Sequence, residues 1–206
     1  MELLKSARRR ALKLGALFPL RNQIFFLWDS VLEINFELRV AEILTKKVSA
    51  DNSLAFQKNP FLPYDSELYI CDLGNSHVCL LNKYSVVKNH ILVVTKNYRH
   101  QSDSLTQDDI EAWKMGIKML KGIGFFNCGP ESGASQPHKH FQVIPGKSEL
   151  INELYSQGVK DGDTINKHPK LKFKHGYICF KGYSGPYYKW PYLQQQAWIL
   201  RRISVF

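Results

Sequence analysis

The sequence has no apolar run that approaches the roughly 20 residues needed to cross a bilayer, so we expect no membrane-spanning segment. No secretory signal pattern is evident at the N-terminus. The cysteines are few and show no C-x-x-C spacing, which disfavours a disulfide framework or a cysteine-based metal site. We therefore expect free thiols in a reducing cytoplasm. The four cysteines are Cys71, Cys79, Cys128 and Cys179.

Acidic residues are also scarce near the N-terminus, where none occurs between Glu2 and Asp29. Basic residues are frequent in the same stretch, and residues 3–17 have the spacing of an amphipathic helix that ends near Pro19. A basic N-terminus of this kind is either a surface helix or an organelle transit peptide. Because serine is rare here, we favour the surface helix.

The overall composition is typical of a soluble globular protein, with 44% hydrophobic and 22% charged residues. A chain of 206 residues can bury a sizeable core, and no linker divides it, so we expect one domain over residues 1–206. The formal net charge of +10 is unusual and is compatible with nucleic-acid binding, with a polyanionic nucleotide or with no specific partner. No RNA-binding signature of paired aromatics occurs, which disfavours nucleic acid.

Hydrophobic periodicity and turn residues predict a mixed fold. Alternating or β-branched runs predict strands over residues 67–72, 77–81, 90–95, 123–127, 137–144 and 171–180. Helical spacing predicts helices over residues 3–17, 148–157 and, with an imperfect period, 29–47. A further helix is expected to begin at Gln107, capped by Thr106 with Asp109 at its third position. These elements indicate an α+β fold with an antiparallel sheet and helices packed on one face.

The most informative stretch runs from Asn127 to Gln142, N-C-G-P-E-S-G-A-S-Q-P-H-K-H-F-Q. Because side chains alternate between the two faces of a strand, we expect His138, His140 and Gln142 on one face and Lys139, like the apolar residues beyond it, on the other. The glycine-rich loop upstream can present backbone N–H groups. This combination suits a site in which a histidine handles a phosphate group.

The same stretch resembles the signature of the histidine triad superfamily, in which Asn-x-Gly and a later Gly precede His-x-His-x-His and a short apolar run. Gln142 stands in place of the third His. That variant resembles the nucleotidyltransferase branch, and the wider sequence is similar to the diadenosine tetraphosphate phosphorylases (ATP adenylyltransferases) over residues 58–145. The segments that carry this similarity are Lys58-Asn-Pro-Phe61, Cys79 to Val87, Asn89 to Thr95, His100-Gln101 and the motif itself.

The resemblance implies a histidine-triad-like fold and assigns three catalytic residues. His140 matches the middle histidine of the motif, which attacks the α-phosphorus to form a nucleotidyl-histidine. The backbone carbonyl of His138 is expected to fix the tautomer of His140. The side-chain amide of Gln142 can donate a hydrogen bond but cannot pass a proton, so we expect transfer to be favoured over hydrolysis.

The resemblance also implies contacts with the substrate. Asn127 is expected near the α-phosphate, the loop is expected to bind phosphates through N–H groups and a hydroxyl, and two lysines supply positive charge. His90 either approaches this site or merely ends a strand. The expected substrate-binding residues are Lys58, Asn82, Lys83, Asn127, Gly133, Ala134, Ser135 and Gln136.

The function implied by the family is reversible phosphorolysis of diadenosine tetraphosphate to ATP and ADP, with inorganic phosphate as the acceptor. Mg²⁺ is expected to arrive on the substrate phosphates, because the remaining histidines have no metal-ligand spacing. We therefore predict no protein metal site, no nucleic-acid or membrane partner, and a cytoplasmic location.

Two alternatives remain open. One is a histidine-triad nucleotide hydrolase, to which Gln142 is the main objection. The other is a truncated, non-catalytic nucleotide-binding homologue, because the C-terminal part is shorter than in the phosphorylases. Residues 182–206 are rich in aromatics and have no counterpart in the family. They are a possible contact for a homo-oligomer.

Overall fold

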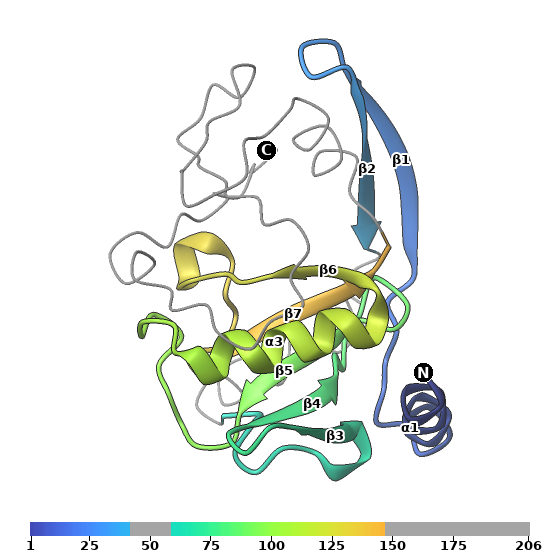
Figure 1. Ribbon diagram of the computed structural model, residues 1–206. Coiled ribbons are helices and arrows are strands. Elements are labelled where there is room, and N and C mark those ends of the chain that lie inside the picture. The colour runs from blue at the N-terminus through green and yellow to red at the C-terminus, as the bar shows by residue number, and fades with distance from the viewer. Residues whose placement is uncertain (42–58, 147–206) are drawn as a thin grey trace.

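The computed structural model describes residues 1–41 and 59–146, which contain a five-stranded antiparallel sheet in the order β3-β4-β5-β7-β6 (Figure 1). A separate two-stranded hairpin pairs β1 with β2. The strands are β1 (Asn22–Asp29), β2 (Ile34–Ala41), β3 (Tyr69–Leu73), β4 (His77–Leu81), β5 (Ile91–Thr95), β6 (Gly122–Phe125) and β7 (His140–Pro145). The helices are α1 (Glu2–Lys13), α3 (Gln107–Leu120) and the short 3-10 turns η1 (Ser66–Leu68) and η2 (Pro130–Ser132).

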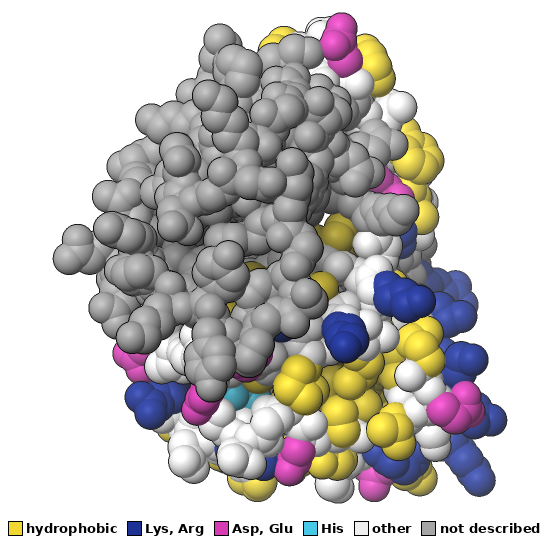
Figure 2. Space-filling model, viewed as in Figure 1, with side chains coloured by type: hydrophobic (Ala, Val, Ile, Leu, Met, Phe, Trp, Pro, Cys, Tyr) yellow, Lys and Arg dark blue, Asp and Glu magenta, His cyan; other side chains and the backbone are white. Residues whose placement is uncertain are grey.

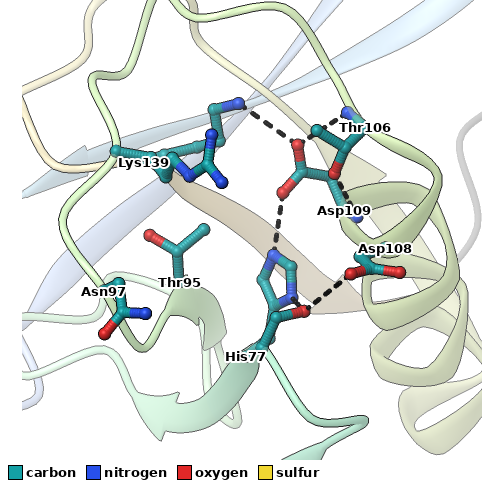
Figure 3. Close-up of a pocket in the computed structure, with 9 residues that line it drawn as sticks. His77, Thr95, Asn97, Thr106, Asp108, Asp109 and Lys139 are labelled. Carbon is teal, nitrogen blue, oxygen red and sulfur yellow. Dashed lines mark hydrogen bonds and ion pairs between the residues drawn. The ribbon is translucent and has the colours of Figure 1, made fainter.

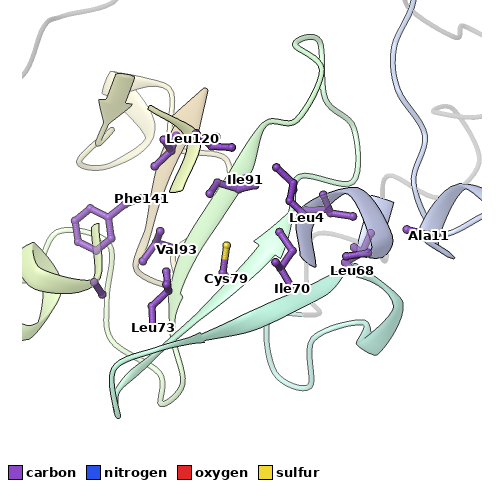
Figure 4. Close-up of a cluster of buried hydrophobic side chains, with 14 of the residues drawn as sticks. Leu4, Ala11, Leu68, Ile70, Leu73, Cys79, Ile91, Val93, Leu120 and Phe141 are labelled. Atoms are coloured by element: carbon purple, nitrogen blue, oxygen red, sulfur yellow. The ribbon is translucent and has the colours of Figure 1, made fainter. Parts of the chain in front are cut away.

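One face of the large sheet is apolar and is covered by α1 and α3. Their inward side chains join those of β4, β5 and β7 in one buried cluster, in which Figure 4 labels Leu4, Cys79, Val93, Leu120 and Phe141. Each large aliphatic side chain buried in this way contributes about 1.5–3 kcal/mol. This cluster holds β7, the strand that carries the motif, on the face covered by the helices.

A glycine sets how closely α3 approaches the sheet. A Cβ at Gly116 would lie 3.0 Å from Cγ2 of Val93 and 3.4 Å from Cγ2 of Val143. Both contacts are tight for a larger residue, so the absence of a side chain lets the helix rest directly on β5 and β7. The predicted start of this helix is confirmed. The hydroxyl of Thr106 accepts the N–H of Asp109, whose carboxylate accepts the N–H of Thr106.

The N-terminal helix is basic on its exposed side and apolar on its buried side, as predicted. Leu4, Ala7 and Ala11 are buried, and Arg10 reaches the sheet, where it donates to the carbonyl of Tyr69 at 2.8 Å. Figure 2 shows lysine and arginine side chains gathered on the side of the molecule where α1 lies. None of the helices in the described part of the chain is long and apolar enough to cross a membrane.

The helix predicted over residues 29–47 is wrong, because residues 22–29 and 34–41 pair as a hairpin. The turn is closed locally: the carboxylate of Asp29 accepts the N–H groups of Val31 and Leu32, each at 2.9 Å, and Glu33 adopts a left-handed φ of 58°. This turn chemistry and the run of aromatic residues before it outweigh the imperfect helical period. The predicted elements at 148–157 and 171–180, and the tail at 182–206, lie outside the described residues.

The hairpin stands apart from the sheet that carries the motif (Figure 1). Its apolar side chains are largely exposed, with Phe26 at 71% and Trp28 at 56%. Neither of the buried clusters in the described residues includes a residue of β1 or β2. The geometry around the motif therefore rests on the large sheet and its two helices.

The other predictions for the sheet are confirmed. The expected strands appear as β3 to β7 within a few residues of their predicted bounds, and all neighbouring pairs are antiparallel. The fold is α+β, and within the described residues α1 and α3 lie on one face. The opposite face carries a second, smaller apolar cluster made by Phe61, Val78, Leu80, Leu92 and Val94.

Candidate active site

The motif strand β7 lies between β5 and β6, and its side chains alternate as predicted. His140 pairs with Val94 and Gln142 with Leu92, so both point to the face away from α3. Phe141 is buried on the helix side, where its ring stacks on that of Phe126 at 4.8 Å. The two motif side chains thus emerge on the face opposite α1 and α3.

The imidazole of His140 is oriented by the backbone. Its Nδ1 lies 2.8 Å from the carbonyl oxygen of His138, and because a carbonyl only accepts, Nδ1 must carry the proton. The other nitrogen, Nε2, then holds a free lone pair. The ring is 5% exposed and lies 5.4 Å from the ring of Phe61. This is the arrangement needed for a nucleophilic nitrogen.

Burial lowers the pKa of His140 below its ordinary value of 6.5; the bond to the His138 carbonyl opposes this shift and the neighbouring His138 adds to it. We expect the His140 imidazole to titrate below pH 6.5 in an NMR titration of isotope-labelled histidine, with its signal assigned by the His140→Ala variant. The unfolded chain binds this proton more readily, so the stability that His140 contributes is present above pH 6.5 and is lost as the pH falls through its folded pKa. A midpoint at or above 6.5 would contradict the prediction.

His138 is completely buried, and both of its ring nitrogens are engaged. Nε2 lies 2.9 Å from the carbonyl oxygen of Thr95, so it carries the proton, and it also lies 2.9 Å from the Thr95 hydroxyl. Nδ1 is left to accept from the side-chain amide of Asn59 at 3.0 Å. Burial lowers the pKa of His138. His138 therefore positions the strand and offers its carbonyl, while its ring is held in place.

Gln142 is connected to a second histidine on the same face. Burial lowers the pKa of His90 to about 4, with the hydrogen bond to Gln142 opposing the shift and the nearby His140 adding to it. The side-chain amide of Asn82 lies 3.2 Å from Nδ1 of His90. His90 therefore lies near the motif strand, in contact with Asn82, and the substrate contact predicted for Asn82 stays a prediction.

The glycine loop has the backbone conformation that its residues predict. Gly129 and Gly133 have φ values of 91° and 89°. The N–H of Gly133 donates to the carbonyl of Pro130 at 2.9 Å, and that of Ala134 donates to the carbonyl of Gly129 at 3.1 Å. Two of the predicted phosphate donors are thus used inside the loop. The predicted phosphate contacts of Gly133 and Ala134, like those of Ser135 and Gln136, stay predictions.

A buried glutamine joins this loop to the motif strand. Gln101 is 1% exposed; its Oε1 accepts the N–H of His140 at 2.8 Å, and its Nε2 donates to the carbonyls of His140 at 3.1 Å and Asn127 at 2.7 Å. Gln101 thereby fixes the backbone at both ends of the loop. This role could not be predicted, because a glutamine in a connecting segment carries no local sequence signal for such contacts.

Lys83, one of the two predicted phosphate-binding lysines, contacts Phe18. Lys83 holds its ammonium 5.7 Å from the centre of the Phe18 ring, and its carbonyl accepts the Phe18 N–H at 2.8 Å. This places Lys83 against the segment that follows α1. Lys58 lies outside the described residues. The roles predicted for both lysines stay predictions.

Behind the motif, Lys139 anchors β7 to the start of α3 (Figure 3). Its ammonium, like the rest of the side chain, is buried and lies 2.8 Å from the carbonyl of Ser104 and 3.1 Å from Oδ2 of Asp109. Oδ1 of Asp109 accepts from Nε2 of His77 at 2.9 Å. Lys139, Asp109 and His77 line a pocket of about 150 Å³. The sequence placed Lys139 on the correct face, but the ion pair was not foreseen.

Comparisons with known proteins agree with the motif. Residues 1–154 match the family model of the Ap4A phosphorylase N-terminal domain. Diadenosine 5',5'''-P1,P4-tetraphosphate phosphorylase 2 of Saccharomyces cerevisiae is 35% identical over 146 residues, which cover 60% of this chain and 45% of that protein. Protein APA1 of the same yeast is 40% identical over 116 residues, which cover 50% and 36%.

The similarity extends to the fold. The crystal structure of yeast Ap4A phosphorylase Apa2 in complex with AMP aligns with a TM-score of 0.62 and 29% identity, covering 78% of this chain and 55% of that one. The chain spans less than half the length of the two curated yeast relatives. Since the family model covers most of the sequence, the chain belongs to the Ap4A phosphorylase N-terminal domain family.

Proposed function

We propose that this chain carries the nucleotidyl-transfer site of an ATP adenylyltransferase, which cleaves diadenosine tetraphosphate with inorganic phosphate to give ATP and ADP. The observation that carries the proposal is the 2.8 Å contact between Nδ1 of His140 and the carbonyl of His138. It leaves Nε2 unprotonated on the face away from the helices. The membership of the chain in a phosphorylase family supports the choice of substrate.

The reaction divides into two displacements at phosphorus. In the first, the Nε2 lone pair of His140 attacks an α-phosphorus, the phosphorus–oxygen bond to the leaving ATP breaks, and an adenylyl-histidine forms. The Nδ1 proton stays on the ring, where the His138 carbonyl stabilises the positive charge that develops. In the second, an oxygen of inorganic phosphate attacks the adenylyl phosphorus. ADP leaves, and Nε2 regains its lone pair.

The surrounding groups act by position and charge. The Gln142 amide, on the same face as His140, is suited to donate to an oxygen of the attacked phosphate. Gln101 holds the backbone of His140 in register with Asn127 through three hydrogen bonds. Mg²⁺ is proposed to arrive as part of the substrate, neutralising its phosphates. Within residues 1–41 and 59–146, no group of three or more His, Cys, Asp or Glu side chains could hold a metal ion.

The test is the intact mass of the protein after brief incubation with diadenosine tetraphosphate and Mg²⁺, quenched without acid because a phosphoramidate is acid-labile. A mass increase of one adenylyl group, discharged by added phosphate with release of ADP, is the expected result. A folded chain that gives neither adduct nor ATP would overturn the proposal. A nucleotide-dependent rise in melting temperature without turnover would instead identify a binding homologue.

Replacing Gln142 with histidine should convert transfer into hydrolysis. An imidazole at this position can pass a proton to or from an attacking water. General acid–base catalysis of this kind accelerates a reaction by about 10²–10⁴-fold. We therefore expect the adenylyl adduct of Gln142→His to decay at least about tenfold faster without phosphate and to release AMP. Chromatography of the products measures both. Gln107→His, on the exposed start of α3, is the matched control, and an unchanged adduct lifetime in Gln142→His would refute the prediction.

We also propose a cytoplasmic location for this activity, which the free thiols of Cys71, Cys79 and Cys128 support. Association into a homo-oligomer through residues 182–206 stays a prediction, because that tail lies outside the described residues. Sedimentation of the full chain would test it.

A further inference from the structure

Two cysteines face each other across the first hairpin of the large sheet. Cys71 in β3 is the register partner of Cys79 in β4. Residues directly opposite in antiparallel strands have Cα atoms about 4.5–5.5 Å apart, within the roughly 4.4–6.8 Å that disulfides span. The two side chains lie on the same face and belong to the same apolar cluster. The pairing of the two strands is therefore compatible with a disulfide between them.

The two thiols differ in access to solvent. Cys79 is 0% exposed in a strand whose five residues are all buried, and Figure 4 shows its sulfur among Val93 and Ile70. Cys71 lies at the edge of the same cluster and is only partly buried. An oxidant in solution therefore meets Cys71 first. Cys79 is shielded from a direct encounter with the oxidant by its burial.

The pKa values of the two thiols also differ. The hydrogen bond from Cys79 lowers the pKa of Cys71 to about 7, although burial and the charge of Asp72 act to raise it. The same bond, together with burial, raises the pKa of Cys79. Since the thiolate is the reactive form, Cys71 is suited to react with an oxidant and Cys79 to resolve the product.

We propose that Cys71 and Cys79 form a reversible redox site, in which a peroxide oxidises the pair to a cross-strand disulfide. The Cys71 sulfur attacks the peroxide, the oxygen–oxygen bond breaks, and Cys71 becomes a sulfenic acid with release of water. The Cys79 sulfur then attacks the Cys71 sulfur, and its proton leaves with the hydroxyl group as a second water. Two electrons pass from the thiols to the peroxide, and two thiols are needed to reverse the reaction.

This site is independent of the proposed adenylyl transfer. The cysteine pair lies on the helix-covered face of the sheet, whereas His140 and Gln142 lie on the opposite face. The pair also joins the two outer strands β3 and β4, which are separated from β7 by β5. Oxidation is therefore expected to occur equally in His140→Ala.

The sequence makes the test direct, because Asp72 separates the two cysteines. The reduced full chain is treated with hydrogen peroxide, alkylated, and cleaved before aspartate residues without reduction. We expect the peptides that contain Cys71 and Cys79 to remain joined, with a mass lower by two hydrogens than the sum of the free thiols, and dithiothreitol to separate them. Cys71→Ser should leave Cys79 reduced, and Cys128→Ser, the matched control, should form the link as the wild type does.

Three outcomes would overturn the proposal. They are Cys71 recovered as sulfinic acid beside an unmodified Cys79, a link from either residue to another cysteine, and a link between two chains. The decisive measurement uses the wild type, so it stands even if a variant fails to fold. A near-ultraviolet circular dichroism spectrum recorded before oxidation confirms that the starting protein is native.

Discussion

Replacing His140 with alanine should eliminate the adenylyl adduct and lower phosphorolysis by roughly 10⁴-fold or more, as loss of a covalent nucleophile does in other enzymes. The reason is local. The only ring nitrogen oriented with a free lone pair among the described motif residues is Nε2 of His140, since both nitrogens of His138 are engaged. Quenched-flow mass measurement of the adduct and a chromatographic assay of ATP give the two readouts.

The fold should survive this substitution. The His140 ring makes one hydrogen bond, to the His138 carbonyl, and contacts Phe61, while the backbone of His140 stays fixed by Gln101. We expect a native near-ultraviolet circular dichroism spectrum. His100→Ala is the matched control, because His100 is exposed and its ring hydrogen-bonds Ser102 at the surface, so its adduct should form normally. An adduct of normal yield in His140→Ala, mapped to another residue, would disprove the assignment of the nucleophile.

Rescue of His140→Ala with free imidazole distinguishes loss of the nucleophile from collapse of the active site. Alanine leaves a space beside Phe61 the size of the missing ring. Free imidazole should enter it and restore part of the release of ATP. No covalent adduct should then remain on the protein. Failure of rescue together with failure to bind nucleotide would indicate a collapsed site, which equilibrium dialysis with AMP detects.

The features that could be predicted from the sequence are those whose signals lie close together in the chain. Thr106 and Asp109 are three residues apart, and their capping box fixed the start of α3 to the residue. The alternation of His140 and Gln142 follows from strand geometry alone. The hairpin β1–β2 was missed because its first strand is exposed on both faces, so its apolar residues show no period of two.

The contacts that organise the site span long distances in the sequence, which explains why they could not be predicted. Asn59 and His138 are 79 residues apart, Gln101 and His140 are 39 apart, and Asp109 and Lys139 are 30 apart. Each pair depends on the strand order β5-β7-β6 and on the way α3 crosses the sheet. No composition or periodicity signal encodes these pairings. The motif located the nucleophile, and only the structure shows how it is held.

The largest loss of stability should come from Asp109→Ala. This change leaves the ammonium of Lys139 buried without its partner, and unpairing a buried ion pair costs about 3–5 kcal/mol. It also removes the carboxylate that accepts from Nε2 of His77 and from the N–H of Thr106. Urea unfolding followed by circular dichroism measures the change in the free energy of unfolding.

The stability that Asp109 contributes should decrease at low pH. Burial acts to raise the pKa of Asp109, but hydrogen bonds from His77 and Thr106 and the charge of Lys139 together lower it from 3.8 to about 2. A depressed folded-state pKa gives stability that is fully present above pH 3.8 and is lost as the pH falls through about 2. Asp109→Ala should therefore lose this component, and its stability should vary less with pH across that interval.

Two further variants isolate the ion pair from the other roles of Asp109. Asp108→Ala removes a neighbouring carboxylate that is exposed and makes a long 3.5 Å contact with Ser76, and we expect a change of no more than about 0.5 kcal/mol. Adding Lys139→Met to Asp109→Ala removes the unpaired charge and should recover part of the lost stability, since the two residues couple directly. With Lys139→Met also measured alone, strictly additive effects of the two substitutions would show that Lys139 and Asp109 do not stabilise the fold as a pair. The orientation of His140 would then rest on Gln101 and the sheet alone.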